Sequence, residues 1–175
     1  MTLKYENNPR YKINLAKLSS YTDICQILKE YNVKYYVYAF VCANGIIKYG
    51  YSADYAGTWG ERVYRQAGHL EGWHTRLNGS SGSDMRIIAE NYREKYNKHL
   101  NRKDVYVVII DMTKLNPEDE GNYQECCREL ERGLINRCIE QNQQAPIGNK
   151  DNVSRMYVGR VKRSVVFNKL FEEVE

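Results

Sequence analysis

The sequence predicts an α+β fold with a small three-stranded antiparallel sheet, formed by a hairpin and one further strand and flanked by helices. Residues 34–51 contain two runs of β-branched and aromatic side chains on either side of Asn44-Gly45, a pattern typical of a β-hairpin. Residues 103–112 are dense in aliphatic side chains, which indicates a buried strand. Helical periodicity occupies most of the chain between these segments, so an all-β fold is excluded.

The chain has 175 residues, enough for one domain with a core of its own. Hydrophobic residues make up 42% and charged residues 27%, a balance that excludes collagenous, coiled-coil and largely disordered chains. The net charge of +4 is compatible with a nucleic-acid partner but does not require one. No apolar run is long enough to cross a bilayer, and the first residues show no secretory signal, so no membrane association is expected.

The five cysteines show no paired zinc spacing, and their number is odd. They are therefore interpreted as free thiols in a reducing compartment, and a cytoplasmic location is expected. Residues 1–34 are expected to form an irregular arm and a short helix over 22–31, and residues 151–175 a basic extension packed on the domain. Between them, residues 35–150 form the predicted domain. Its helices are expected over residues 61–70, 84–100 and 117–142.

The first hairpin strand has two different faces. One carries Tyr36, Tyr38 and Phe40 and is expected to be wet, whereas the aliphatic face, with Val37, Ala39 and Val41, is expected to meet the helices.

Two registers are possible for the second strand. A two-residue turn at Asn44-Gly45 would place Tyr49 on the face of Tyr38. A three-residue loop would place Lys48 there instead, with Ile47 on the aliphatic face. We prefer the second register, because it buries Ile47. Tyr38, Lys48 and Gly50 then share one surface, where a glycine permits close approach of another group.

Two groups of charged side chains could carry chemistry. Arg62, Arg65 and His69 are spaced to share one side of a helix, and guanidinium groups match the oxygens of a phosphodiester. An ordinary solvated basic face is the alternative. Glu131 lies at the edge of an apolar helix stripe. It is either a surface glutamate paired with Arg128 or Arg132, or a carboxylate that holds a divalent cation.

In their order along the chain, these segments resemble the GIY-YIG nuclease superfamily over about residues 35–150. The two short motifs are matched by Tyr36-Val37-Tyr38 and Lys48-Tyr49-Gly50, and the arginine helix by GERVYRQAGH. The late pattern is matched by Glu131, Leu134, Ile135, Pro146 and Asn149. Tyr36 and Lys48 depart from the signature, and a lysine at the second tyrosine position is similar to restriction-type members. The spacing leaves open whether Arg62 or Arg65 is the family arginine.

The resemblance implies a metal-dependent DNA endonuclease of restriction or phage type. The catalytic residues it implies are Tyr38, Lys48, Arg62, His69 and Glu131. Glu131 would be the one protein ligand of a single Mg²⁺ or Mn²⁺ ion. Tyr49, Arg65, Arg76 and Asn149 are the candidate substrate-binding residues, although Asn149 better suits fixing the loop after the last helix, and Tyr49 could replace Lys48 in the active site.

The implied partner is double-stranded DNA, and a homodimer or higher homo-oligomer is possible. The alternative function is a nucleic-acid-binding module that keeps the fold without cleavage.

Overall fold

The computed structural model describes residues 8–18, 22–53, 91–100, 104–114 and 123–149. Its strands are β1 (Arg10–Asn14), β2 (Tyr36–Cys42), β3 (Gly45–Ser52) and β4 (Tyr106–Asp111). Its helices are the 3-10 turn η1 (Leu15–Lys17), α1 (Thr22–Glu30) and α4 (Tyr123–Asn142), and residues 91–96 are also helical. No helix in these ranges is long and apolar enough to span a bilayer.

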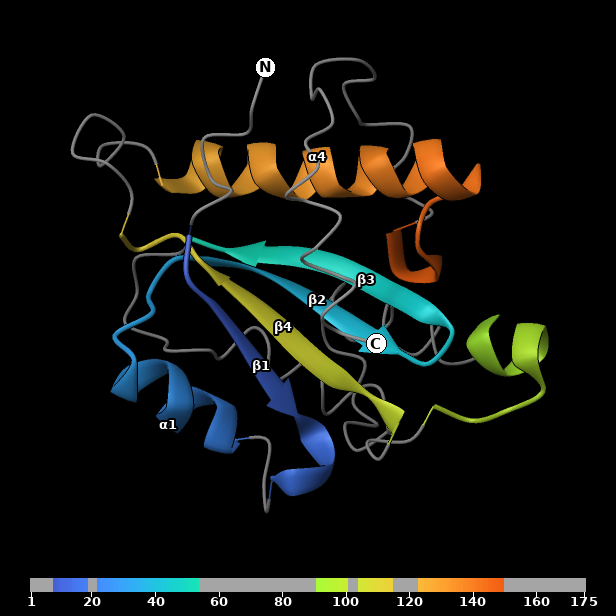
Figure 1. Cartoon of the computed structure of the whole chain (residues 1–175), viewed down its shortest axis with the longest axis horizontal. Helices are drawn as coiled ribbons and strands as arrows, with labels where there is room; N and C mark the ends of the chain where they lie inside the picture. Colours follow the sequence, from blue (N-terminus) through green and yellow to red (C-terminus); the bar gives the residue numbers. More distant parts are fainter. Residues whose placement is uncertain (1–7, 19–21, 54–90, 101–103, 115–122, 150–175) are drawn as a thin grey trace, which may run out of the picture.

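The α+β class is confirmed, but the expected three-stranded sheet is wrong, because the sheet has four antiparallel strands in the order β1-β4-β2-β3 (Figure 1). The fourth strand comes from the segment expected to be an irregular arm. β1 pairs with β4 from Arg10↔Ile110 to Asn14↔Tyr106. A five-residue edge strand with two charged side chains carries little local signal, and its partner lies far along the chain.

The hairpin register places Tyr38 opposite Gly50 and Phe40 opposite Lys48. The expected grouping of Tyr38, Lys48 and Gly50 on one face is therefore confirmed. The turn itself is shorter than expected, since Cys42 already pairs with Gly45, and the register then shifts at a β-bulge.

The bulge changes the position of Ile47. We expected this side chain on the aliphatic face, but it packs in the cluster that contains Phe40 and Cys42. The extra residue in the bulged strand is the physical reason, because it reverses the alternation of faces at that point.

Both faces of the sheet are buried, so the expectation of a wet tyrosine face is wrong. Tyr36, Tyr38 and Phe40 lie in one core cluster with Ile24 and Leu28 of α1. A tyrosine ring is large and mainly apolar, so a row of tyrosines can be core as readily as surface.

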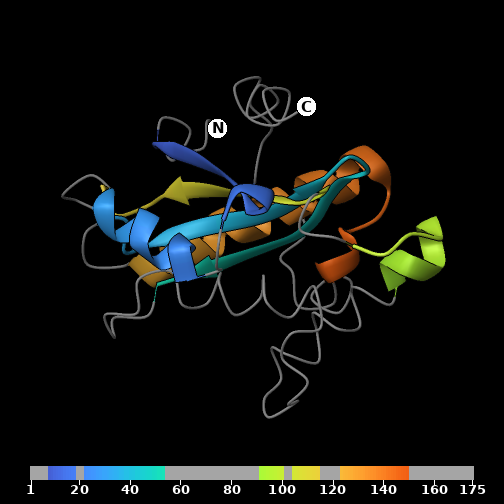
Figure 2. The same ribbon diagram turned by 90° about the horizontal axis from the view of Figure 1, so that it is seen from below.

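The aliphatic face of β2 packs under α4, as expected. Cys127, Leu130 and Leu134 of α4 share its cluster. α4 packs mainly against β3, and Figures 1 and 2 show it lying along the sheet, away from α1. The expected helices over 22–31 and 117–142 are confirmed over α1 and α4, and the expected strand within 103–112 is confirmed as β4.

Candidate active site

The phenol of Tyr38 lies over Gly50 of the neighbouring strand. A Cβ atom built on Gly50 would meet the Tyr38 Oη at 2.3 Å and Cζ at 2.4 Å. The missing side chain at Gly50 is therefore what allows the Tyr38 ring to cross β3. Because β3 is the outer strand of the sheet, this crossing carries the hydroxyl towards the sheet edge.

The ring of Tyr38 is held in place by aromatic neighbours on its own strand. Its centroid lies 6.1 Å from that of Tyr36 and 5.7 Å from that of Phe40, the latter at an interplanar angle of 79°. Tyr38 is only 1% exposed. The phenol is thus a rigid, buried group whose position is set by packing on both sides.

Lys48 lies on the same face, two residues before Gly50. Residues two apart on a strand are about 7 Å apart, and a diagonal pair across two strands lies at a similar distance. Lys48 is 9% exposed, unusually low for a lysine. Tyr49 lies on the opposite face, opposite Ala39 in the register, and is 2% exposed beneath α4. Burial raises the pKa of the Tyr49 phenol well above its ordinary value.

Asn149 fixes the strand that carries these residues. Its Oδ1 accepts a hydrogen bond from the Tyr49 N–H at 2.8 Å, and its Nδ2 donates to the Tyr49 carbonyl at 3.0 Å. The side chain is fully buried. Asn149 therefore supplies to the outer edge of β3 the two hydrogen bonds that a further strand would make. These two bonds tie the segment after α4 to β3.

Glu131 lies half-buried on α4, the helix that packs mainly against β3. Arg128, one turn earlier, donates from Nε to the Tyr51 Oη at 3.4 Å, which places this flank of α4 next to β3. Its Nη1 also pairs with Glu125 at 3.0 Å. Burial, followed by the charges of Cys126 and Glu131, raises the pKa of the Cys127 thiol.

Tyr38 and Lys48 thus lie on the face that carries α1, and Glu131 lies on the helix that covers the other face. Lys48 belongs to the outer strand β3, Tyr38 lies opposite Gly50 of β3, and α4, which carries Glu131, packs mainly against β3. The remaining candidates, Arg62, Arg65, His69 and Arg76, lie outside the described residues, as do the expected helix over 61–70 and the extension over 151–175.

The described residues contain no cluster of three or more histidine, cysteine, aspartate or glutamate side chains that could hold a metal ion. A single carboxylate such as Glu131 still suits Mg²⁺, which keeps several of its waters and takes one or two protein carboxylates. A zinc site, which takes three or four protein ligands, does not fit this part of the chain.

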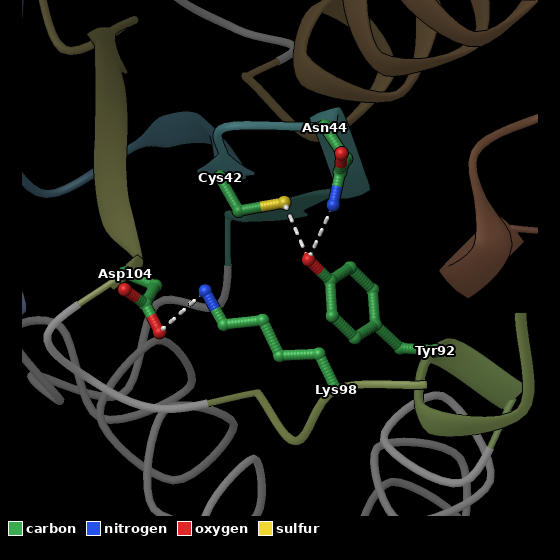
Figure 3. Close-up of polar contacts among 5 residues, drawn as sticks. All are labelled: Cys42, Asn44, Tyr92, Lys98 and Asp104. Carbon is green, nitrogen blue, oxygen red and sulfur yellow. Dashed lines mark hydrogen bonds and ion pairs between the residues drawn. The ribbon is translucent and has the colours of Figure 1, made fainter. Parts of the chain in front are cut away.

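The turn end of the hairpin holds contacts that the sequence did not reveal (Figure 3). Asn44 Nδ2 donates to the Tyr92 Oη at 2.8 Å, and the Cys42 thiol donates to the same oxygen at 3.6 Å. Lys98 and Asp104 pair nearby at 3.5 Å. The Asn-Gly pattern indicated a turn, but nothing in it identified Tyr92 as the partner.

Comparison of the chain with protein-family models, with curated proteins and with solved structures gives no match in any of the three.

Proposed function

We propose that the chain is a metal-dependent DNA endonuclease with a GIY-YIG-like fold, of restriction or phage type. The observation that supports this most strongly is the Tyr38 hydroxyl positioned over Gly50, on the same face as Lys48. A phenol and an ammonium group on one face of the sheet suit the activation of a water molecule for attack on a phosphodiester.

In this proposal Tyr38 orients or deprotonates the attacking water. A phenol ordinarily titrates near pH 10, and a neighbouring cation favours its charged form. In this proposal Lys48 supplies that cation, since it lies on the same face as Tyr38, whereas Tyr49 lies on the opposite face beneath α4. Arg62 or Arg65 binds the scissile phosphate, with His69 and Arg76 as further contacts.

Glu131 is the proposed protein ligand of one Mg²⁺ or Mn²⁺ ion. A bound divalent ion would stabilise the charge on the leaving oxygen. Because Glu131 belongs to α4, on the other side of the sheet from Tyr38 and Lys48, the proposed site would form around the edge of β3 rather than on one face of the sheet. Asn149 supports the site by holding the backbone of β3 between Lys48 and Gly50.

A second candidate function is a nucleic-acid-binding module without cleavage. The burial of Tyr38, at 1% exposure, favours it, because a catalytic phenol must reach its water. Basic side chains would still bind phosphates in such a module, since those contacts position a duplex without any chemistry.

The experiment that tests the proposal is nicking of supercoiled plasmid DNA with Mg²⁺ or Mn²⁺. Three variants are compared with the wild type: Tyr38→Phe, Glu131→Gln and, as the matched control, Glu129→Gln. Glu129 lies exposed on the same helix and loses the same charge. We expect nicking to fall by about 10²–10⁴-fold in Tyr38→Phe, to be lost in Glu131→Gln and to be unchanged in Glu129→Gln.

Equal rates for Tyr38→Phe and the wild type would refute the assigned role of the phenol. Absence of nicking by the wild type with both ions, together with salt-dependent binding to the same plasmid, would establish the binding module instead.

A further inference from the structure

A large open cavity lies at the turn end of the hairpin, away from the Tyr38 hydroxyl. Its volume is about 1160 Å³, somewhat above the range of ordinary small-molecule sites. The walls come from the end of β1, the hairpin turn, the helical residues 91–96, the start of β4, the end of α4 and residues 144–147. The cavity therefore depends on the whole fold, and no single sequence motif contains it.

Three cationic side chains from three separate elements line this cavity: Lys12, Lys95 and Arg137. Among the described residues that line the cavity, the one carboxylate belongs to Asp104, which pairs with Lys98 at 3.5 Å. Within the described ranges, neither Lys12 nor Lys95 has a carboxylate partner. The cavity therefore carries an excess of positive charge and would attract an anion.

Each lysine lies beside a tyrosine of the cavity. Lys12 Nζ lies 4.3 Å from the ring centroid of Tyr106, and Lys95 Nζ lies 5.3 Å from that of Tyr96. Both rings are only half-buried. A cation beside an exposed aromatic surface suits a ligand that joins a phosphate to a flat ring, because the ammonium binds the phosphate and tyrosine stacks on a base.

The remaining polar lining is rich in side-chain amides, several of which already make one hydrogen bond within the chain. These are Asn14, Asn44, Gln141, Asn142 and Gln144. Side-chain amides are well suited to hydrogen-bond the edges of nucleobases. An inorganic anion would use the lysines alone, whereas a nucleotide would use the lysines, the rings and the amides together.

From these features we propose that the turn-end cavity binds a nucleotide, with its phosphate at Lys12 and Lys95 and its base among the tyrosines and amides. Tyr49 lines the cavity and lies between Lys48 and Gly50 in the sequence. Ile46 lies at the cavity wall, and the distance along β3 from Gly50 to Ile46 is about 14 Å. A nucleic acid held at the candidate active site could therefore also reach the cavity, and this source of the nucleotide rests on the proposed function. A free mononucleotide is the other source.

The test measures binding in the presence of a chelator, so that it does not depend on cleavage. The probes are a fluorescein-labelled single-stranded oligonucleotide, followed by anisotropy, and adenosine monophosphate, followed by titration calorimetry. The test variant is Lys12→Gln/Lys95→Gln. The matched control is Lys17→Gln/Lys29→Gln, which removes the same charge from exposed positions on η1 and α1. Thermal melting checks that both variants fold.

We expect the test variant to bind the oligonucleotide about tenfold more weakly than the control, and the slope of log K against log salt to fall by about 1.4. If the test variant also binds adenosine monophosphate more weakly than the control does, a free nucleotide is sufficient to occupy the cavity. If only oligonucleotide binding is weakened, the bound nucleotide belongs to a nucleic-acid strand. Equal binding by test and control variants to both probes would overturn the proposal. Because no metal is present, failure of plasmid nicking would leave this result unaffected.

Discussion

Replacing Gly50 by alanine should destabilise the protein because of one specific contact. The added Cβ atom would lie 2.3, 2.4 and 2.9 Å from the Oη, Cζ and Cε2 atoms of Tyr38. The ring cannot easily move away, since it is 1% exposed and packs against Tyr36 and Phe40. The substitution therefore either displaces the phenol or strains the hairpin.

Two effects of opposite sign set the magnitude. Overpacking of a core costs about 1–3 kcal/mol. Alanine is more favourable than glycine in a strand by about 0.5–1 kcal/mol. We expect a net loss of about 1–2 kcal/mol in the free energy of unfolding, and a melting temperature lower by about 2–8 °C for a chain of this size.

A double-mutant cycle isolates the contact. All three clashing atoms are absent from leucine, so in a Tyr38→Leu background Gly50→Ala should be neutral or stabilising. Gly45→Ala is the control: Gly45 has a φ of 104° and no atom within 4 Å, so its cost comes from the backbone and should not depend on residue 38. Urea unfolding of the four proteins measures the coupling. An equal cost of Gly50→Ala in both backgrounds would refute the proposed crossing of Tyr38 over β3.

Further predictions concern the hydrogen bonds from Asn149 to β3, the turn end of the hairpin and the core of α4. Asn149→Ala leaves the Tyr49 N–H and carbonyl without their buried partner, so urea unfolding should show that the free energy of unfolding falls by about 2–4 kcal/mol. A change below about 0.5 kcal/mol would contradict the stabilising role of these two hydrogen bonds. Burial is the main cause that raises the pKa of Tyr92 from its ordinary value near 10 to about 12. The folded state thus retains a proton that the unfolded chain releases, and the resulting stability is present below pH 10 and lost as the pH rises towards 12. The wild type should lose more stability over this window than Tyr92→Phe, and equal losses would argue against it. The buried Cys127 thiol should react with a thiol reagent slowly in the native protein and rapidly in urea, whereas fast native labelling would contradict its position.

Much of the fold follows from local patterns in the sequence. Alternation and the Asn-Gly turn predicted the hairpin, aliphatic density predicted β4, and helical spacing predicted α1 and α4. β1 could not be predicted in the same way. Its five residues become a strand only because β4, almost a hundred residues later, provides the partner.

The burial of the tyrosine face of β2 could not be predicted from the sequence either. Alternation correctly grouped Tyr36, Tyr38 and Phe40, but it does not tell whether a tyrosine face is covered. Burial of that face depends on α1 and on Tyr92, which come from other parts of the chain.

For the candidate site, the sequence predicted which residues share a face but not how they are held. The expected three-residue loop grouped Tyr38 with Lys48 and Gly50 correctly only because a bulge in β3 supplies the register shift that the longer loop was expected to give. The bulge at Ile47 adds one residue that no turn rule predicts, and the hydrogen bonds between Asn149 and Tyr49 join residues 100 positions apart. The turn-end cavity draws on six separate segments, so only the folded chain reveals it.

In the proposed function, Glu131 and Tyr38 serve one site at the edge of β3. The most direct measurement is the anomalous difference map of crystals grown with Mn²⁺ and a DNA duplex. We expect one ion bound to the Glu131 carboxylate, with the scissile phosphate beside it and the Tyr38 hydroxyl facing that phosphate. A Glu131 carboxylate that binds no ion, or an ion separated from Tyr38 by the sheet, would contradict it.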